Sequence, residues 1–158
     1  MPNANARAGV RTRCLGFVLL AIALSGCHRT PADEAIRKTI ATMQAAGDKQ
    51  DIDGVMVPVA DDFAGRGDDE LNLDRKQLKQ FLVLLRMQQG GRMHATLGPI
   101  TVNVLGDDRA TADFPMLVTG GSNLLPKNGQ AEDVHTGWRR DGGDWKLISA
   151  EWKEKGTK

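Results

Sequence analysis

The chain has 158 residues, enough for one ordinary domain and too few for two. Its 21 Lys and Arg residues against 20 Asp and Glu residues give a formal net charge of +1, which excludes a nucleic-acid-binding protein that works by bulk positive charge. Hydrophobic residues make up 41% of the chain and charged residues 26%, which is typical of a folded globular protein and excludes wholesale disorder.

Basic residues followed by an apolar run occupy the start of the chain. Arg7, Arg11 and Arg13 precede the apolar segment 15–24, and no acidic residue occurs before Asp33. This order is typical of the n-region and h-region of a signal peptide. As a helix the apolar segment would rise about 15 Å, half of a ~30 Å hydrocarbon core. The pattern therefore predicts a targeting segment rather than a transmembrane helix.

The segment Leu24-Ser25-Gly26-Cys27 resembles the lipobox of bacterial lipoproteins, in which an apolar residue and two small residues precede a cysteine. The resemblance implies that the Cys27 sulfur carries a diacylglyceryl group, that cleavage removes residues 1–26, and that the new amino terminus is acylated. The alternative is an ordinary secretory signal with a chance cysteine. Three acyl chains would hold the protein firmly on a membrane, because each buried CH₂ contributes about 0.8 kcal/mol.

Cleavage before Cys27 would also change the charge and the thiol content of the chain. It removes three arginines and no acidic residue, which leaves 18 basic against 20 acidic residues and a net charge of −2. A lipidated Cys27 would leave no thiol nucleophile, because no other cysteine remains. His28 follows the cysteine. By the resemblance to enterobacterial lipoproteins, a residue other than Asp there implies the outer membrane, with the domain facing the periplasm.

Two helices are predicted at the start of the mature domain, after a lipidated tether of residues 27–31. Ile36, Ile40 and Met43 recur at helical spacing until Gly47 and predict the first helix. A short apolar stripe predicts a second helix that ends near Pro58, followed by an extended segment over residues 59–63.

A third helix is predicted to begin after Asp74. Asp74 and Gln77 have the spacing of a capping box, in which each side chain bonds the other residue's backbone N–H. The apolar stripe that follows places Leu85 on the buried face, and the helix is predicted to stop at Gly90-Gly91.

Four longer strands are predicted after Gly91. Apolar residues alternate on odd positions over 93–97 and on even positions over 100–104, so Gly98-Pro99 must absorb a one-residue phase shift through a bulge or a bend. A second strand covers residues 110–118, and a final hairpin pairs residues 134–140 with 145–152. The long connection 120–131 joins the strand 110–118 to the hairpin.

Three N-terminal helices packed on a curved antiparallel sheet of about four strands form an α+β fold. The Asp-Ile-Asp-Gly and Ala-Asp-Asp-Phe segments within residues 48–63, the capped third helix, and the closing segment 138–148 resemble the nuclear transport factor 2-like (cystatin-like α+β cone) superfamily. The resemblance covers about residues 32–153 and leaves 154–158 as a frayed tail. It implies a cone-shaped domain with a pocket between the concave sheet and the helices.

Some enzymes of this superfamily place an acid and a histidine or tyrosine inside the pocket, but this chain has no tyrosine. Asp113, His94 and His135, all on predicted strands, are the remaining candidates. The alternative is that they have no catalytic role: Asp113 would be solvated or paired across the sheet, and His94 and His135 would be surface or structural residues. No metal-binding motif or cofactor motif supports a metal site or a bound cofactor.

The leading hypothesis is a noncatalytic periplasmic domain, anchored to the membrane through Cys27, that binds a small apolar ligand or an envelope protein. Its candidate contact residues are Leu124, Leu125 and Trp138, and a homodimer through the sheet face is one form of the hypothesis. One alternative is an isomerase, dehydratase or hydrolase that uses Asp113 and His135 as acid and base. Another is an envelope assembly protein that works through the connection 120–131.

We predict that Cys27→Ala yields an unlipidated precursor that stays uncleaved or is mislocalised, because sulfur lipidation precedes cleavage in bacterial lipoproteins. Metabolic labelling with a fatty-acid analogue measures this directly. Equal labelling of the wild-type and variant chains would contradict the prediction.

Overall fold

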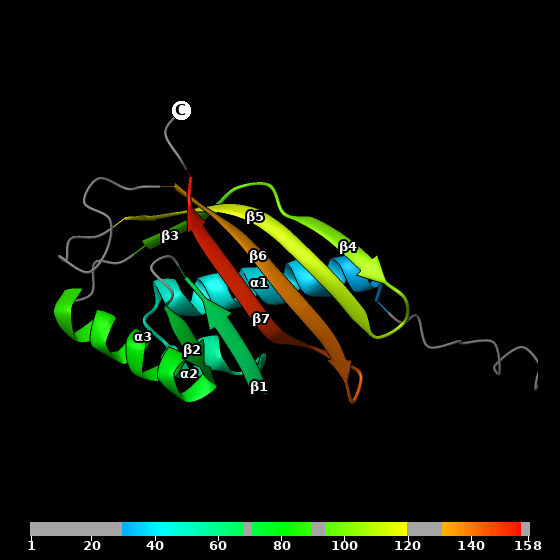
Figure 1. Ribbon diagram of the computed structural model, residues 1–158, viewed down its shortest axis with the longest axis horizontal. Helices are drawn as coiled ribbons and strands as arrows, with labels where there is room; N and C mark the ends of the chain where they lie inside the picture. Colours follow the sequence, from blue (N-terminus) through cyan, green and yellow to red (C-terminus); the bar gives the residue numbers. More distant parts are fainter. Residues whose placement is uncertain (1–29, 68–70, 90–93, 120–130, 156–158) are drawn as a thin grey trace, which may run out of the picture. The chain divides into compact units, whose positions relative to one another are not determined.

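Three helices and a seven-stranded sheet form the fold in the computed structural model, which describes residues 30–67, 71–89, 94–119 and 131–155 (Figure 1). The helices are α1 (Ala32–Asp48), α2 (Ile52–Met56) and α3 (Arg75–Gln89). The strands are β1 (Val59–Arg66), β2 (Asn72–Asp74), β3 (His94–Leu97), β4 (Thr101–Leu105), β5 (Arg109–Thr119), β6 (Ala131–Asp141) and β7 (Asp144–Glu154). The predicted signal peptide, Cys27, Leu124 and Leu125 lie outside the described residues. None of the described helices combines the length and apolar character needed to cross a bilayer.

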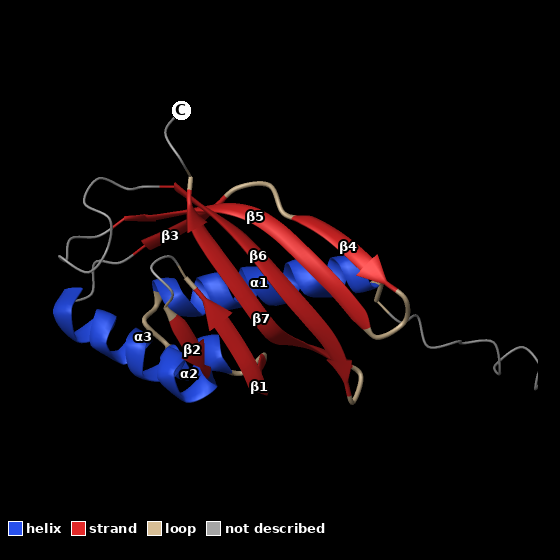
Figure 2. Ribbon diagram, in the orientation of Figure 1, coloured by secondary structure: helices blue, strands red, loops and turns tan. Residues whose placement is uncertain are grey.

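The sheet has the order β2-β1-β7-β6-β5-β3, and β4 also pairs with β5 (Figure 2). All pairs are antiparallel except β1 with β7. The three predicted helices are confirmed, but the prediction of about four strands is wrong. Two of the additional strands, β1 and β2, join the sheet through β7, which lies at the far end of the sequence. The remaining one arises because the first long strand is divided into β3 and β4.

The division between β3 and β4 confirms the predicted phase shift at Gly98-Pro99. Both strands pair with β5, but their registers differ by one residue. Within the break, the Gly98 N–H donates to the Pro115 carbonyl at 2.8 Å. A Cβ on residue 98 would lie 2.5 Å from Pro115 Cγ, so the backbone can approach β5 this closely only at a glycine.

The core lies between α1 and the inward face of β5, β6 and β7. Ile36 of α1 has no exposed surface, and Trp138 of β6 is 1% exposed. The Trp138 indole N–H donates to the Thr136 hydroxyl at 2.9 Å, and that hydroxyl donates to the Ala112 carbonyl at 2.8 Å. The buried polar atoms of Thr136 and Trp138 are therefore satisfied, which removes the cost of burying them.

The predicted capping box at the start of α3 is confirmed. The Gln77 N–H donates to the Asp74 carboxylate at 2.7 Å, and the Asp74 N–H donates to the Gln77 side-chain oxygen at 2.8 Å. The helix also buries the predicted residue, since Leu85 is 3% exposed, whereas its neighbour Leu84 is 45% exposed.

We predict that Leu85→Ala lowers the free energy of unfolding by about 2–4 kcal/mol, because it removes buried methyl groups and leaves a cavity. Leu84→Ala is the matched control on the same helix and should change stability by no more than about 0.5 kcal/mol. Urea denaturation of the three proteins measures both values. Equal losses in the two variants would show that α3 does not pack through Leu85.

Candidate functional site on the outer face of the sheet

The outer face of the sheet is the face turned away from α1, and it carries most of the candidate chemistry. Side chains alternate along a strand, so every second residue of β5, β6 and β7 points away from the core. The strand pairing aligns these residues in three rows that run across the sheet. In order they are the basic row (Arg109, Arg139 and Lys146), the neutral row (Thr111, Gly137 and Ser149) and the acidic row (Asp113, His135 and Glu151).

The acidic row brings the two predicted candidates Asp113 and His135 together. They are direct cross-strand partners on β5 and β6, and His135 Nδ1 lies 2.5 Å from Asp113 Oδ1. The side chains are 52% exposed for His135 and 48% for Asp113. The contact orients the imidazole ring, but both groups stand in water rather than in a dry pocket.

The acidic row continues across the sheet into β7 and β1. Glu151 is the cross-strand partner of His135, and Arg66 of β1 is the partner of Glu151. Arg66 Nη1 lies 3.8 Å from Glu151 Oε1, with both side chains largely exposed. An exposed ion pair of this length contributes little to fold stability.

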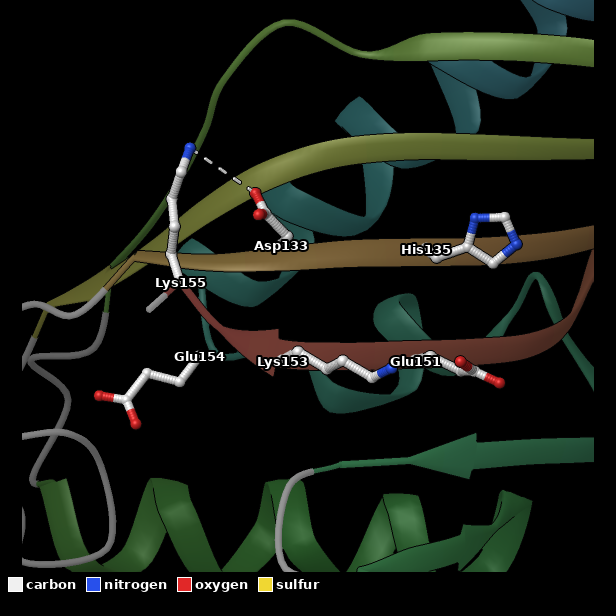
Figure 3. A pocket seen from close by; sticks show the side chains of 6 residues that line it. All are labelled: Asp133, His135, Glu151, Lys153, Glu154 and Lys155. Atoms are coloured by element: carbon white, nitrogen blue, oxygen red, sulfur yellow. Dashed lines mark ion pairs between the residues drawn. The ribbon is translucent and has the colours of Figure 1, made fainter. Parts of the chain in front are cut away.

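A surface hollow of about 450 Å³ adjoins the acidic row (Figure 3). Its lining consists of titratable side chains from β6, from β7 and from the residue after β7: Asp133, His135, Glu151, Lys153, Glu154 and Lys155. Charges of both signs surround the hollow, and Lys155 Nζ lies 3.8 Å from Asp133 Oδ1. Such a lining suits a charged or strongly polar group better than an apolar ligand. Within the described part of the chain, no group of three or more His, Cys, Asp or Glu residues is placed to hold a metal ion.

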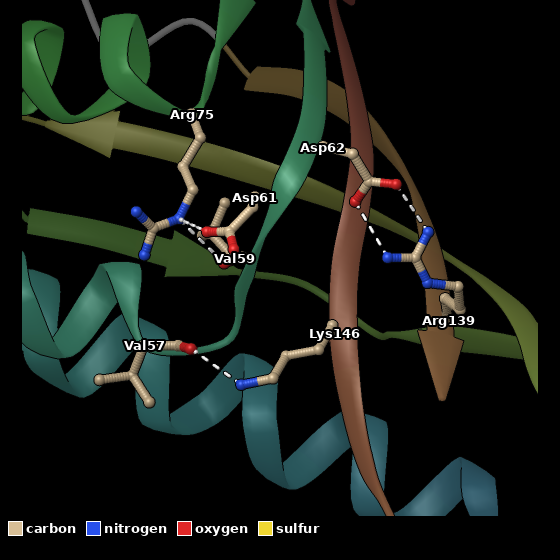
Figure 4. Close-up of polar contacts among 7 residues, drawn as sticks. All are labelled: Val57, Val59, Asp61, Asp62, Arg75, Arg139 and Lys146. Atoms are coloured by element: carbon tan, nitrogen blue, oxygen red, sulfur yellow. Dashed lines mark hydrogen bonds and ion pairs between the residues drawn. The ribbon is translucent and has the colours of Figure 1, made fainter. Parts of the chain in front are cut away.

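The basic row is organised around a bidentate ion pair between β1 and β6 (Figure 4). Arg139 donates to both carboxylate oxygens of Asp62, at 2.7 and 3.0 Å. The hydrogen bond from Arg139 lowers the pKa of Asp62 below its ordinary value, and the nearby charges of Arg139 and Arg109 act in the same direction. Lys146 Nζ donates to the Val57 carbonyl at 3.2 Å. Arg139 is thus already neutralised within the chain.

The other sequence candidates lie elsewhere. His94 is 2.8 Å from Asp48 Oδ1 and ties β3 to the end of α1, apart from Asp113 and His135. Trp138 lies in the core. Sequence reasoning missed the basic row. Residues 109, 139 and 146 occupy outward-facing positions, and the pattern of inward-facing apolar residues on the same strands could have revealed them.

No protein-family model and no curated protein sequence matches the chain. Solved structures do match. An NTF2-like protein of unknown function from Pseudomonas putida KT2440 is 24% identical, with a TM-score of 0.68, over 80% of this chain and 88% of that chain. An NTF2-like protein with a cystatin-like fold from Novosphingobium aromaticivorans is 21% identical, with a TM-score of 0.67. The match covers 92% of this chain and 94% of that chain.

A third match is a candidate dehydratase of the NTF2-like family from Streptomyces avermitilis, which is 17% identical with a TM-score of 0.67 over 78% of this chain and 96% of that chain. The described part of the chain therefore has the NTF2-like, cystatin-like α+β fold, as the sequence resemblance implied.

We predict that Arg139→Gln raises the pKa of Asp62 toward its ordinary value, because the substitution removes the hydrogen bond and charge that lower it. A carboxyl with a lowered folded pKa stabilises the fold above its unfolded pKa, and this contribution is lost as pH falls through the folded pKa. The variant should therefore lose stability at neutral pH, and the difference from wild type should vanish in acid.

Carbon-detected NMR titration of the Asp62 carboxyl measures the first effect, and urea denaturation at neutral and acidic pH measures the second. Arg66→Gln is the control, since Arg66 contacts Glu151 instead. An Asp62 titration that is unchanged in Arg139→Gln would contradict the assignment.

Proposed function

We propose that this protein is a noncatalytic binding domain, held in the bacterial cell envelope by lipid on Cys27, that recognises a charged protein surface through the outer face of its sheet. The observation that carries this proposal is the in-register arrangement of the basic, neutral and acidic rows. A broad face with ordered charge favours recognition of another protein.

The inward face of the sheet is a weaker candidate for a binding site. Ile36, Phe114 and Trp138 occupy it with 0%, 9% and 1% exposure. The hollow lies on the other face and has a charged lining. This distribution favours a protein partner with charged groups over a small apolar ligand inside the cone.

Acid–base catalysis is the second candidate, favoured by the contact between Asp113 and His135 and by the name of the Streptomyces neighbour. Catalytic acids and bases usually sit in water-excluded clefts that tune their pKa values. Asp113 and His135 are half exposed instead. Turnover of a small substrate that both Asp113→Asn and His135→Gln abolish would support catalysis instead.

The lipid anchor would hold the domain near the membrane. Thr30 is the third residue after Cys27, and three residues of extended chain reach about 10 Å. The domain would therefore meet partners that lie at the same membrane surface rather than partners deep in the periplasm.

We predict that a benzophenone amino acid at position 111, in the neutral row, forms one discrete crosslinked product when the full-length protein is irradiated in living cells. The control is the same amino acid at position 38, because Lys38 is exposed on α1, away from the outer face. Immunoblotting of the envelope fraction detects the product. Products of equal yield at both positions, or none at position 111, would overturn the proposal.

A further inference from the structure

We infer that the hollow beside the acidic row is a binding site for a short peptide with free termini, and that a dipeptide is the ligand length that fits it. The ligand is a small zwitterion rather than a protein surface, so this site goes beyond the proposed function.

Two neighbouring rows of the outer face line the hollow (Figure 3). His135 and Glu151, which are cross-strand partners on β6 and β7, form its acidic end. Asp133 and Lys153 are cross-strand partners two residues away on the same strands, and with Lys155 they form its lysine end. Alternate residues of a strand are about 7 Å apart, so the two ends are separated by about this distance.

The two ends carry opposite formal charge. At the acidic end, the Glu151 carboxylate supplies one negative charge beside the imidazole of His135. At the lysine end, the ammonium groups of Lys153 and Lys155 outnumber the single carboxylate of Asp133, which leaves one positive charge. The hollow is therefore polarised along the strands.

Three further charged side chains near the hollow leave this polarity unchanged. Asp113 and Arg66 flank the acidic end on β5 and β1, and their opposite charges balance. Glu154 also lines the hollow, but it has the opposite phase to Lys153 on β7, and Figure 3 shows its side chain extending away from Lys153.

The ion pairs around the hollow are long. The distances from Arg66 Nη1 to Glu151 Oε1 and from Lys155 Nζ to Asp133 Oδ1 are both 3.8 Å, beyond the ~2.7–3.2 Å of a hydrogen bond. The bidentate pair of the basic row is shorter, at 2.7 and 3.0 Å. Within the described part of the chain, no hydrogen bond joins the charged groups of Asp133, Glu151, Lys153 and Lys155 to one another. Their donors and acceptors can therefore serve a ligand.

The acidic end is equipped to accept hydrogen bonds from an ammonium group. His135 Nδ1 contacts Asp113, and when this nitrogen donates to the carboxylate, Nε2 of the neutral ring is an acceptor. The Glu151 carboxylate supplies two acceptor oxygens beside it. A terminal ammonium has three N–H donors, so it can bond to both side chains at once. At the other end, Lys153 and Lys155 can donate to a terminal carboxylate.

The spacing of the two ends selects the length of the ligand. An extended chain spans about 3.5 Å per residue, so the charged ends of a dipeptide lie about 7 Å apart and match the two ends of the hollow. A single amino acid is half as long. A simple cation or anion meets one favourable end and one unfavourable end, whereas a zwitterion of matched length is attracted at both. The volume of about 450 Å³ lies within the range of roughly 300–1,000 Å³ for small-molecule sites.

The first test is an NMR titration of the isotope-labelled full-length protein in detergent micelles with alanyl-alanine. The backbone amides of residues 135 and 153 should shift, with a dissociation constant of about 1 mM because exposed ion pairs are individually weak. N-acetyl-alanyl-alanine lacks the ammonium, alanyl-alanine amide lacks the carboxylate, and free alanine is too short. Each should bind about fivefold more weakly.

Equal affinities for the four compounds, or no shift with alanyl-alanine up to its solubility limit, would overturn the inference. Tighter binding of the amide than of alanyl-alanine itself would also overturn it, because such an order describes a site for cations.

The second test assigns each end of the hollow to one charge of the ligand. Lys153→Gln combined with Lys155→Gln should weaken alanyl-alanine about fivefold and make its affinity equal to that of the amide, because no partner for the carboxylate remains. Glu151→Gln should instead reduce the difference between alanyl-alanine and its N-acetyl derivative to less than about twofold.

The matched control is Lys38→Gln combined with Lys49→Gln, which removes two exposed lysines from α1 and its C-cap. It should leave every affinity within about twofold of wild type. A double variant at positions 153 and 155 that still prefers the free carboxylate would contradict the assignment of the lysine end.

These outcomes are separate from the crosslink expected at position 111. A discrete crosslink together with a failed alanyl-alanine series would overturn the dipeptide site and leave the proposed function standing. A charge-selective alanyl-alanine series without the crosslink would overturn the proposed function and leave the dipeptide site standing.

Discussion

The antiparallel pairing of β5, β6 and β7 is the constraint on which the rest of the structure depends. Because side chains alternate along a strand, the register that buries Ala112 and Thr136 also places Asp113 and His135 side by side on the outer face. The hydroxyl of Thr136 fixes this register further by donating to the Ala112 carbonyl. A one-residue slip would expose the core and bury the charges. The stability of the fold and the layout of the site therefore have the same physical cause.

Two irregularities adapt that register to the charge pattern. On β7, Leu147 pairs with Trp138 whereas Ser149 pairs with Gly137, so Ile148 is an extra residue in the ladder. The outward positions on β7 therefore change from the even-numbered Lys146 on one side of the bulge to the odd-numbered Ser149 and Glu151 on the other. The break at residues 98–100 has a similar effect on the edge of the sheet, where it gives β3 and β4 different registers on β5. Bulges of this kind redirect side chains at functional surfaces.

Sequence reasoning succeeded where the signal is local and failed where it depends on distant partners. The capping box at Asp74 and the phase shift at Gly98 follow from residues that are neighbours in the chain. β1 and β2 were missed as sheet strands because β1 pairs with β7, and no pattern within residues 59–66 reveals that partner. Asp113 and His135 were identified singly, but their contact required the register between two strands separated by a long connection. The rows themselves emerge only when the registers of β5 with β6 and of β6 with β7 are combined.

The charge rows are not explained by the stability of a single chain. Exposed ion pairs such as Arg66 with Glu151 contribute little to folding, and like charges stand as direct neighbours at Arg109, Arg139 and Lys146. Like-charge neighbours cost free energy unless something compensates them. Asp62 compensates Arg139 through a bidentate bond and also interacts with the nearby charge of Arg109. A surface that carries an only partly compensated basic row beside an acidic row gains most when an oppositely ordered surface covers it.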